Sequence, residues 1–278
     1  MSGVAVEYGP RRGELAARTA RAVGKAALNA VLSIVIVLVL WVGALWAFNV
    51  TPYIGKNPLD VFEFLFTDEK SGDNRALVMA KLGETLVDAS IGFIAGLSVA
   101  ILIAILFRLS RGVEHALMPM AMLLRSVPLI AMAPIIILIF GRQQVTVAVM
   151  GAIVVLFPAL VNIVFGLRSA SPQMLDVVTV FGGNTWMAMR KVAFPASLPA
   201  FFAAVKISVP GAITGALLVE WLATGQGIGY GIVSAIGKAK TNEVWAYVVV
   251  ITVVSIVLYN LVALIESWVL TRFSPTGR

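Results

Sequence analysis

The sequence predicts an all-α membrane protein with six transmembrane helices. Of its 278 residues, 60% are hydrophobic and only 13% are charged, which leaves too little polar surface to cover a soluble domain of this length. The apolar residues also gather in runs of about 20 or more, long enough to cross a hydrocarbon core of roughly 30 Å. In a soluble protein the net charge of +7 would suggest nucleic acid as a partner. Here we attribute it to the basic residues that orient membrane proteins, and we expect no nucleic acid.

The first predicted span follows a basic N-terminal stretch and is too long for the core of a signal peptide. The predicted spans cover residues 26–48, 84–107, 115–140, 145–167, 200–223 and 245–270. Six spans place both ends of the chain on one side of the membrane. The loops on that side hold Arg108, Arg111 and Arg168, so the positive-inside rule predicts cytoplasmic termini. The outer segment 49–81 also holds four basic residues, together with five acidic ones.

This pattern divides the chain into two tails and one membrane domain. We expect a cytoplasmic N-terminal tail at 1–25, a single transmembrane domain at 26–270 and a cytoplasmic C-terminal tail at 271–278.

Residues that could carry out chemistry are scarce. The chain has no cysteine and one histidine, His115, which argues against disulfides, thiolate metal sites and histidine clusters. No Gly-x-x-x-x-Gly-Lys-Ser/Thr phosphate loop occurs, and no motif assembles a nucleophile with a base. We therefore expect no catalytic residue, cofactor or metal in this chain, so the energy for any transport must come from elsewhere.

The segment 171–199, between the fourth and fifth predicted spans, is partly polar and suggests two short helices with a bend. Ser171 is placed to cap a helix whose first turn holds Pro172, and Asp176 lies near its positive end. Leu175, Val178 and Gly182 fall on one face at helical spacing. An ordinary amphipathic loop is the alternative reading.

The second half of this segment has its own start and stop signals. Gly182 and Gly183 break the first helix, and Asn184 can cap a second one with an apolar stripe. The stripe and its basic neighbours are Trp186, Met189, Val192, Arg190 and Lys191. Pro195 and Pro199 are expected to end this helix before the fifth span.

Charged residues inside the apolar runs are costly and mark either a polar path or internal pairing. Glu84 and Asp88 lie four residues apart near the outer surface, and Arg125, Glu220 and Glu266 lie in later spans. Both readings stay open for each of these residues.

Proline and glycine residues shape the predicted bundle. Pro128 and Pro134 interrupt the third span, and broken spans often border a pathway. The pairs Gly92 with Gly96 and Gly211 with Gly215 permit close helix contact. The predicted path residues are Arg125, Pro128, Pro134 and Glu220.

The segment 171–199 resembles the cytoplasmic coupling loop of the binding-protein-dependent permeases of ATP-binding cassette (ABC) importers. The resemblance rests on Asp176, Gly182 six residues later and Pro195 thirteen after that, with apolar Val192 and Phe194 before the proline. The family's loop carries Glu-Ala-Ala, then Gly, then Ile-x-Leu-Pro. This chain departs from it with Asp176-Val177-Val178 and with Phe194.

The run from Leu124 to Pro134, followed by Phe140-Gly141, is similar to the permeases of sulfonate, taurine, nitrate and bicarbonate importers. Glu220 followed by Gly227-Ile228-Gly229 fits the same group, so the likeness covers about residues 85–266. It departs at Arg142-Gln143-Gln144, where a glycine-containing turn is expected.

The resemblance implies the fold of a type I ABC importer permease and a multi-pass location in the bacterial plasma (inner) membrane. It implies a second permease subunit, either identical or different, an external solute-binding protein and a cytoplasmic ABC ATPase dimer that holds ATP and Mg. It also implies a small solute such as a sulfonate, nitrate or bicarbonate. The residues expected to couple to the ATPase are Leu175, Asp176, Val178, Phe181, Gly182, Arg190, Lys191 and Pro195.

Two other functions remain open at this point. An ion-coupled secondary transporter would use Glu84, Asp88, Glu220 or Glu266 as proton or sodium sites, although six spans and no visible inverted repeat argue against it. A membrane scaffold would carry no solute. The solute itself does not follow from the sequence, because related permeases also carry neutral vitamin precursors and aromatic acids.

Overall fold

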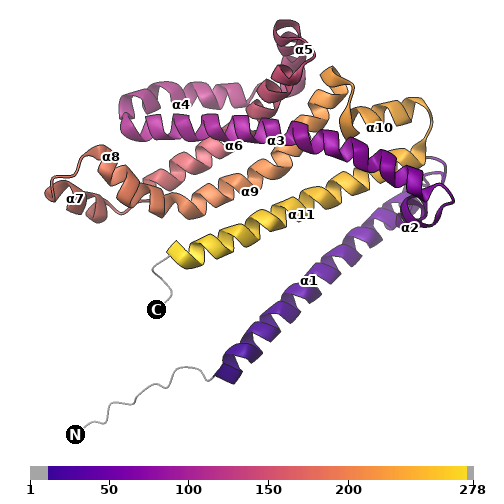
Figure 1. The fold of residues 1–278 in the computed structure, drawn as a ribbon, viewed down its shortest axis with the longest axis horizontal. Coiled ribbons are helices and arrows are strands. Elements are labelled where there is room, and N and C mark those ends of the chain that lie inside the picture. The colour runs from indigo at the N-terminus through magenta and orange to yellow at the C-terminus, as the bar shows by residue number, and fades with distance from the viewer. Residues whose placement is uncertain (1–11, 274–278) are drawn as a thin grey trace. The chain divides into compact units, whose positions relative to one another are not determined.

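The computed structural model describes the backbone of residues 12–273 and the side chains from Leu28 to Arg272, apart from Ala30. Every regular element in the described range is a helix, as the sequence predicts (Figure 1). Backbone contacts divide the chain into two units, Met1–Phe62 and Glu63–Arg278. Residues 1–11 and 274–278, which belong to the predicted tails, lie outside the described residues.

The first unit contains α1 (Arg12–Ala47) and α2 (Pro58–Phe62). Helix α1 begins within the predicted N-terminal tail, and its described apolar stretch, Val31–Ala47, is shorter than the ~20 residues of a typical span. The predicted first span therefore stays a prediction. At the start of α2, the Asn57 side chain accepts hydrogen bonds from the amides of Leu59 and Asp60 at 2.8 and 3.0 Å, which satisfies two free helix donors.

The second unit begins with η1 (Glu63–Thr67) and continues through four long helices and several short ones. The long helices are α3 (Ser71–Leu109), α6 (Gln144–Arg168), α9 (Phe194–Val219) and α11 (Thr241–Phe273). The others are α4 (Arg111–Arg125), α5 (Leu129–Phe140), α7 (Pro172–Val180), α8 (Thr185–Ala188), η2 (Met189–Ala193), η3 (Glu220–Thr224) and α10 (Gly227–Gly237). Helices α3, α6 and α9 pack on one another, and α11 lies against α9 (Figure 1).

Within the described residues, four helical segments are long and apolar enough to cross a membrane. They are Ser71–Leu109, Gln144–Arg168, Thr185–Thr224 and Thr241–Arg272. Helices α4 and α5 together could form a fifth, but they are bent by 101° at Ser126–Pro128. The predicted interruption of the third span, 115–140, is therefore confirmed at Pro128. Pro128 lies at this break, whereas Pro134 lies inside α5 without ending it.

Glycine residues bring three of the long helices into close contact. A Cβ atom added to Gly92 of α3 would lie 2.8 Å from the Cα of Gly151 of α6, so the two backbones touch there. A Cβ on Gly96 would lie 2.7 Å from the Ala152 carbonyl oxygen, and one on Gly215 of α9 would lie 3.3 Å from the Gly151 Cα. The predicted close approach is confirmed at Gly92, Gly96 and Gly215. Gly151 is the shared partner of Gly92 and Gly215, whereas Gly96 meets Ala152 and Val155. Such close contacts hold membrane helices together, because lipid removes the hydrophobic drive for them to associate.

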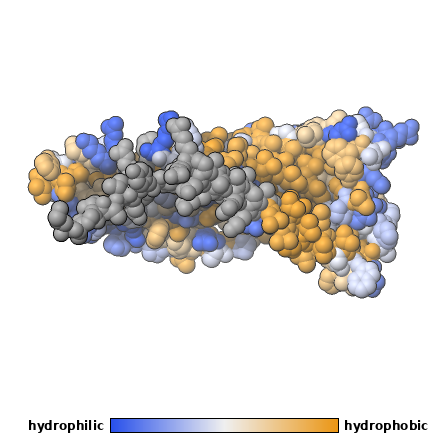
Figure 2. Space-filling view, turned by 90° about the horizontal axis from the view of Figure 1, so that it is seen from below, coloured by the Kyte–Doolittle hydropathy of each residue, from blue (hydrophilic) through white to orange (hydrophobic). Residues whose placement is uncertain are grey.

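Many large apolar side chains point outward. They include Leu102, Leu138, Phe165 and Leu264, each at least 67% exposed. Figure 2 shows broad hydrophobic areas with hydrophilic residues on both sides of them. Such a surface suits lipid or other apolar partners rather than water.

Candidate functional site

The bend between α7 and α8 follows from glycine and asparagine geometry. Gly182 has φ = +78°, a left-handed conformation that glycine adopts without strain. The amides of Gly182 and Gly183 donate to the carbonyl oxygens of Thr179 and Val178 at 2.9 and 2.8 Å, which satisfies the end of α7. Asn184 then caps α8 by accepting from the Met187 amide at 2.9 Å. The predicted break and second cap are confirmed.

Two other predictions for this segment are wrong. Ser171 precedes α7, but its side chain makes no capping bond; the hydroxyl donates instead to Gln173 Oε1 at 2.5 Å. Pro195 and Pro199 do not end the helix, which runs on from Thr185 to Thr224. The π-helical turn η2 widens the backbone just before Pro195, which falls in the first turn of α9. Proline lacks the N–H that a regular helix would use there, and the altered hydrogen-bond pattern of the π turn lets the helix continue past it.

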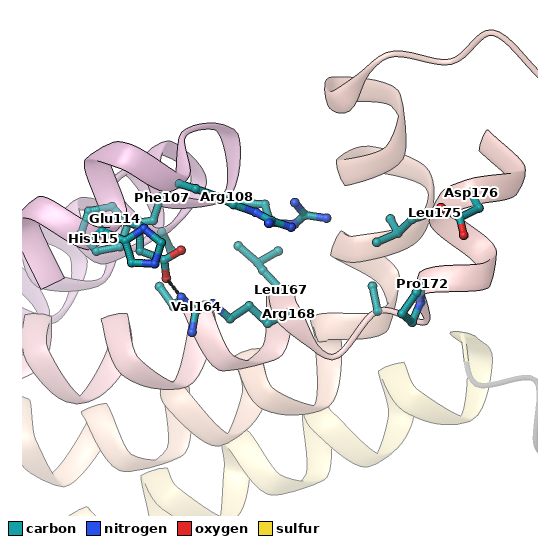
Figure 3. A pocket seen from close by; sticks show the side chains of 13 residues that line it. Phe107, Arg108, Glu114, His115, Val164, Leu167, Arg168, Pro172, Leu175 and Asp176 are labelled. Atoms are coloured by element: carbon teal, nitrogen blue, oxygen red, sulfur yellow. Dashed lines mark hydrogen bonds and ion pairs between the residues drawn. The ribbon is translucent and has the colours of Figure 1, made fainter. Parts of the chain in front are cut away.

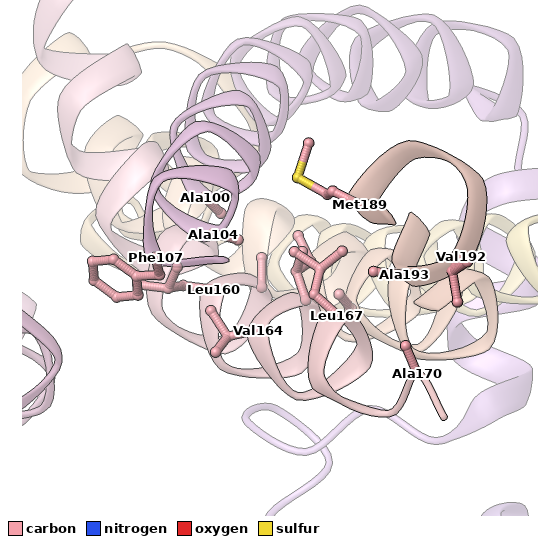
Figure 4. Packing of buried hydrophobic residues seen from close by; sticks show 13 residues of the cluster. Ala100, Ala104, Phe107, Leu160, Val164, Leu167, Ala170, Met189, Val192 and Ala193 are labelled. Atoms are coloured by element: carbon pink, nitrogen blue, oxygen red, sulfur yellow. The ribbon is translucent and has the colours of Figure 1, made fainter. Parts of the chain in front are cut away.

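The inner face of the α7–α8 segment is anchored to the core of the second unit. Met189 and Val192 are buried in a cluster with residues of α3 and α6 (Figure 4). Leu175 and Val178 of α7 are partly buried against the same cluster. These two predicted coupling residues therefore hold α7 in place rather than lie on its free surface.

The outer face of α7 is apolar and uncovered. We call it the α7 face; it consists of Met174, Val177, Val180 and Phe181, which are 55–86% exposed. Asp176, Gly182, Arg190, Lys191 and Pro195 are exposed as well. The sequence analysis did not identify Met174, Val177 and Val180 as members of this face. Helical periodicity identifies apolar stripes on a helix, but it does not show which stripe packs against the core.

The Asn184 cap allows a local test of the bend. Replacing Asn184 with alanine removes the acceptor of the Met187 amide, and loss of such a cap costs about 1 kcal/mol. We expect amides of α8 to exchange with deuterium about fivefold faster, since local opening becomes easier by that free energy. Asn184→Ser should retain the wild-type rate, and equal exchange in wild type and N184A would contradict this account of the cap.

Side chains of α3 and η3 cap the start of α10. Three successive α10 amides are capped by side chains: Gly227 donates to Glu84 at 2.6 Å, Ile228 to Thr85 Oγ1 at 2.8 Å and Gly229 to Glu220 at 2.7 Å. Glu220 is fully buried. Negative side chains at a helix N-terminus are stabilised by its unpaired donors and dipole. Glu84 and Glu220 thus have a structural task, whereas the neighbouring buried Asp88 caps no helix within the described part of the chain.

The other predicted path residues lie elsewhere. Arg125, Pro128 and Pro134 are exposed on α4, α5 and the break between them, while Glu220 is buried. Arg125 is the last residue of α4, about 20 Å along that helix from Arg111 at 1.5 Å per residue. The single chain does not gather these four residues into one lined site, and their role in a path stays a prediction.

Two ion pairs link helices of the second unit. Lys206 of α9 and Glu266 of α11 lie 2.6 Å apart, so pairing is the reading that holds for Glu266. Glu114 of α4 pairs with Arg168 of α6. Sequence reasoning overlooked Lys206, although a lysine within an apolar run is itself a signal that a partner is needed.

Among the described residues, no group of three or more His, Asp or Glu side chains is placed to hold a metal ion.

Comparison with known proteins fits this architecture. Residues 91–274 match the family described as binding-protein-dependent transport system inner membrane component. A probable ABC transporter permease protein of Haemophilus influenzae is 27% identical over 246 residues, 88% of this chain and 96% of that one. A putative aliphatic sulfonates transport permease of Bacillus subtilis is 30% identical over 64% of each chain. A nitrate import permease of Leptolyngbya laminosa is 26% identical over 71% of this chain and 70% of its own. The chain belongs to the family of binding-protein-dependent transport system inner membrane components, the permease subunits of ABC transporters.

Proposed function

We propose that this chain forms part of the translocation path of an importer for a small anion delivered by an external binding protein. A separate cytoplasmic ATPase with bound ATP and Mg would drive it, and a second permease subunit, identical or different, would complete the path. Relatives named for aliphatic sulfonates, nitrate and bicarbonate support an anion. Relatives named for riboflavin and formylaminopyrimidine keep the solute itself open to experiment.

The observation that carries the coupling proposal is the α7 face. Three large apolar side chains lie exposed on a nine-residue helix and a fourth, Phe181, lies at its C-terminal end; this helix lies between two spans. Exposed apolar patches of this kind mark protein contacts. Arg190 and Lys191 lie exposed after the bend and could meet acidic groups of the ATPase. The positive-inside distribution supports placing this segment, and both termini, in the cytoplasm.

The route by which movement of α7 would reach the membrane is short. Leu175 and Val178 anchor α7 on the core cluster, and Asn184 fixes the start of the following helix. That helix continues without a break from Thr185 to Thr224. Near the C-terminal end of this helix, Glu220 caps α10. Closure of the ATPase dimer would displace α7, and this one stiff helix would carry the displacement to α10. We propose that this is the coupling step.

The test is co-purification of the cognate ATPase with the intact chain. Phe181→Asp places a charge at the most exposed position of the α7 face, whereas Phe181→Leu preserves an apolar contact. Loss of a central apolar anchor costs about 2 kcal/mol or more at an interface, which corresponds to roughly thirtyfold weaker association. We expect F181D to lose both association with the ATPase and solute uptake, and F181L to retain most of both. Undiminished association and uptake in F181D would overturn the coupling assignment.

A further inference from the structure

A cavity of about 540 Å³, lined by both apolar and charged side chains, opens where two spans end (Figure 3). Its walls come from the last turns of α3 and α6 and the first turns of α4 and α7. Arg108, Arg111 and Arg168 line it together with His115, Glu114 and Asp176. A cavity of this size falls within the roughly 300–1,000 Å³ range of small-ligand sites. The proposed coupling role of α7 does not explain why charged side chains gather in it.

The cations of this cavity are only partly neutralised. Glu114 is buried and pairs with Arg168, so these two charges neutralise each other. Among the described residues, neither Arg108 nor Arg111 forms an ion pair. Asp176 is the remaining acid, and in Figure 3 it lies on the far side of the cavity from Arg108. The wall formed by the α3–α4 turn therefore carries two cations without a counter-charge.

Arg108 presents a second, independent signal. Its Nε atom is buried and has no hydrogen-bond acceptor in the described part of the chain, and its guanidinium projects across the cavity towards Leu175 (Figure 3). A buried donor without an acceptor costs about 1–3 kcal/mol. Guanidinium groups satisfy two donors at once when they meet the oxygens of a phosphate. An oxyanion in the cavity would accept from the guanidinium N–H groups that project into it.

The depth of the cavity indicates where such an oxyanion comes from. Arg108 lies in the last turn of α3, and Arg168 is the last residue of α6, so the site is level with the ends of two membrane spans. Lipid phosphates lie at this level, and basic pockets between membrane helices bind anionic head groups. The N-terminus of α4, capped by Ser110, adds partial positive charge on the same wall.

We infer that this cavity binds the phosphodiester head group of an anionic phospholipid, held by Arg108 and Arg111 between the end of α3 and the start of α7. Residues of the α7 face do not line the cavity, so the lipid and an ATPase could be bound at once. A lipid in this position would brace α7 against α3 without depending on which solute is carried. An acidic side chain of the ATPase is the competing occupant.

The experiment is native mass spectrometry of the detergent-purified full-length chain titrated with phosphatidylglycerol. Phosphatidylcholine, which has a phosphodiester but no net charge, serves as the lipid control, and inorganic phosphate is the free-anion probe. Arg108→Gln with Arg111→Gln removes the two cations. Arg272→Gln is the matched control, because Arg272 is exposed in the last turn of α11 and contacts Trp268 outside the cavity.

We expect phosphatidylglycerol to bind at least tenfold more tightly than phosphatidylcholine, and R108Q/R111Q to abolish that preference while R272Q keeps it. Arg108→Lys should retain part of it. Equal retention of phosphatidylglycerol by wild type and R108Q/R111Q would overturn the inference. So would displacement of the lipid by millimolar phosphate, which would indicate a free-anion site. Unchanged lipid binding with loss of ATPase association in R108Q/R111Q would assign the cavity to the partner's acidic group.

Discussion

Gly229→Ala is expected to unfold the corner between η3 and α10. A Cβ atom at Gly229 would overlap the backbone of Leu217, with the carbonyl oxygen of Leu217 nearest, and backbone atoms cannot turn aside as a flexible side chain can. The shift would also pull the Gly229 amide away from Glu220, leaving a buried carboxylate without its donor. Together these effects should cost about 3 kcal/mol or more.

The same helix supplies the matched control. Gly237 is the last residue of α10, and a Cβ atom there would meet nothing within 4 Å. Because glycine weakens a helix relative to alanine by roughly 0.5–1 kcal/mol, Gly237→Ala should leave stability unchanged or raise it slightly. The unfolding temperatures of G229A and G237A can be measured in detergent, with tryptophan fluorescence as the signal. A loss of 3 kcal/mol corresponds to a fall of roughly 6–12 °C; G229A and G237A with equal unfolding temperatures would refute this packing.

Hydropathy predicted that the chain spans a membrane but not where its helices begin. The second span was predicted from residue 84, yet α3 starts at Ser71 and includes Asp73, Arg75 and Lys81. Hydrophobic runs report the part of a helix that lies in lipid, whereas backbone hydrogen bonds continue past it into the polar region. The sharp bend after α4 was likewise beyond prediction, since Pro128 marks a possible break but its angle depends on packing.

Local chemistry predicted the α7–α8 bend because its cause lies in adjacent residues. Gly182 supplies a left-handed turn and Asn184 a cap, and both act without help from the rest of the fold. Which face of α7 turns inward is decided by the cluster of Met189, Val192 and residues of two distant helices. Glu220 shows the same limit: its position in a span indicated a costly charge, but only the fold reveals that three α10 amides meet side chains of α3 and η3.

The Lys206–Glu266 pair should prove strongly coupled. Its atoms lie 2.6 Å apart, and the two side chains are only 22% and 17% exposed between helices that the lipid would otherwise surround. Removing one member leaves the other charge buried without a partner, which costs far more than the pair contributes as a whole. We expect Lys206→Met and Glu266→Gln each to destabilise the protein by about 2–3 kcal/mol.

The double variant separates pairing from any individual role of these residues. K206M/E266Q carries no unpaired charge, so it should lose only about 1 kcal/mol, giving a coupling energy of about 3–5 kcal/mol in a double-mutant cycle. Unfolding temperatures of the four proteins in detergent provide the cycle. If the two single losses simply add, the ion pair does not hold α9 to α11. If stability recovers but solute uptake does not, one of the two charges serves transport as well, and testing E266Q and K206M separately for uptake identifies which.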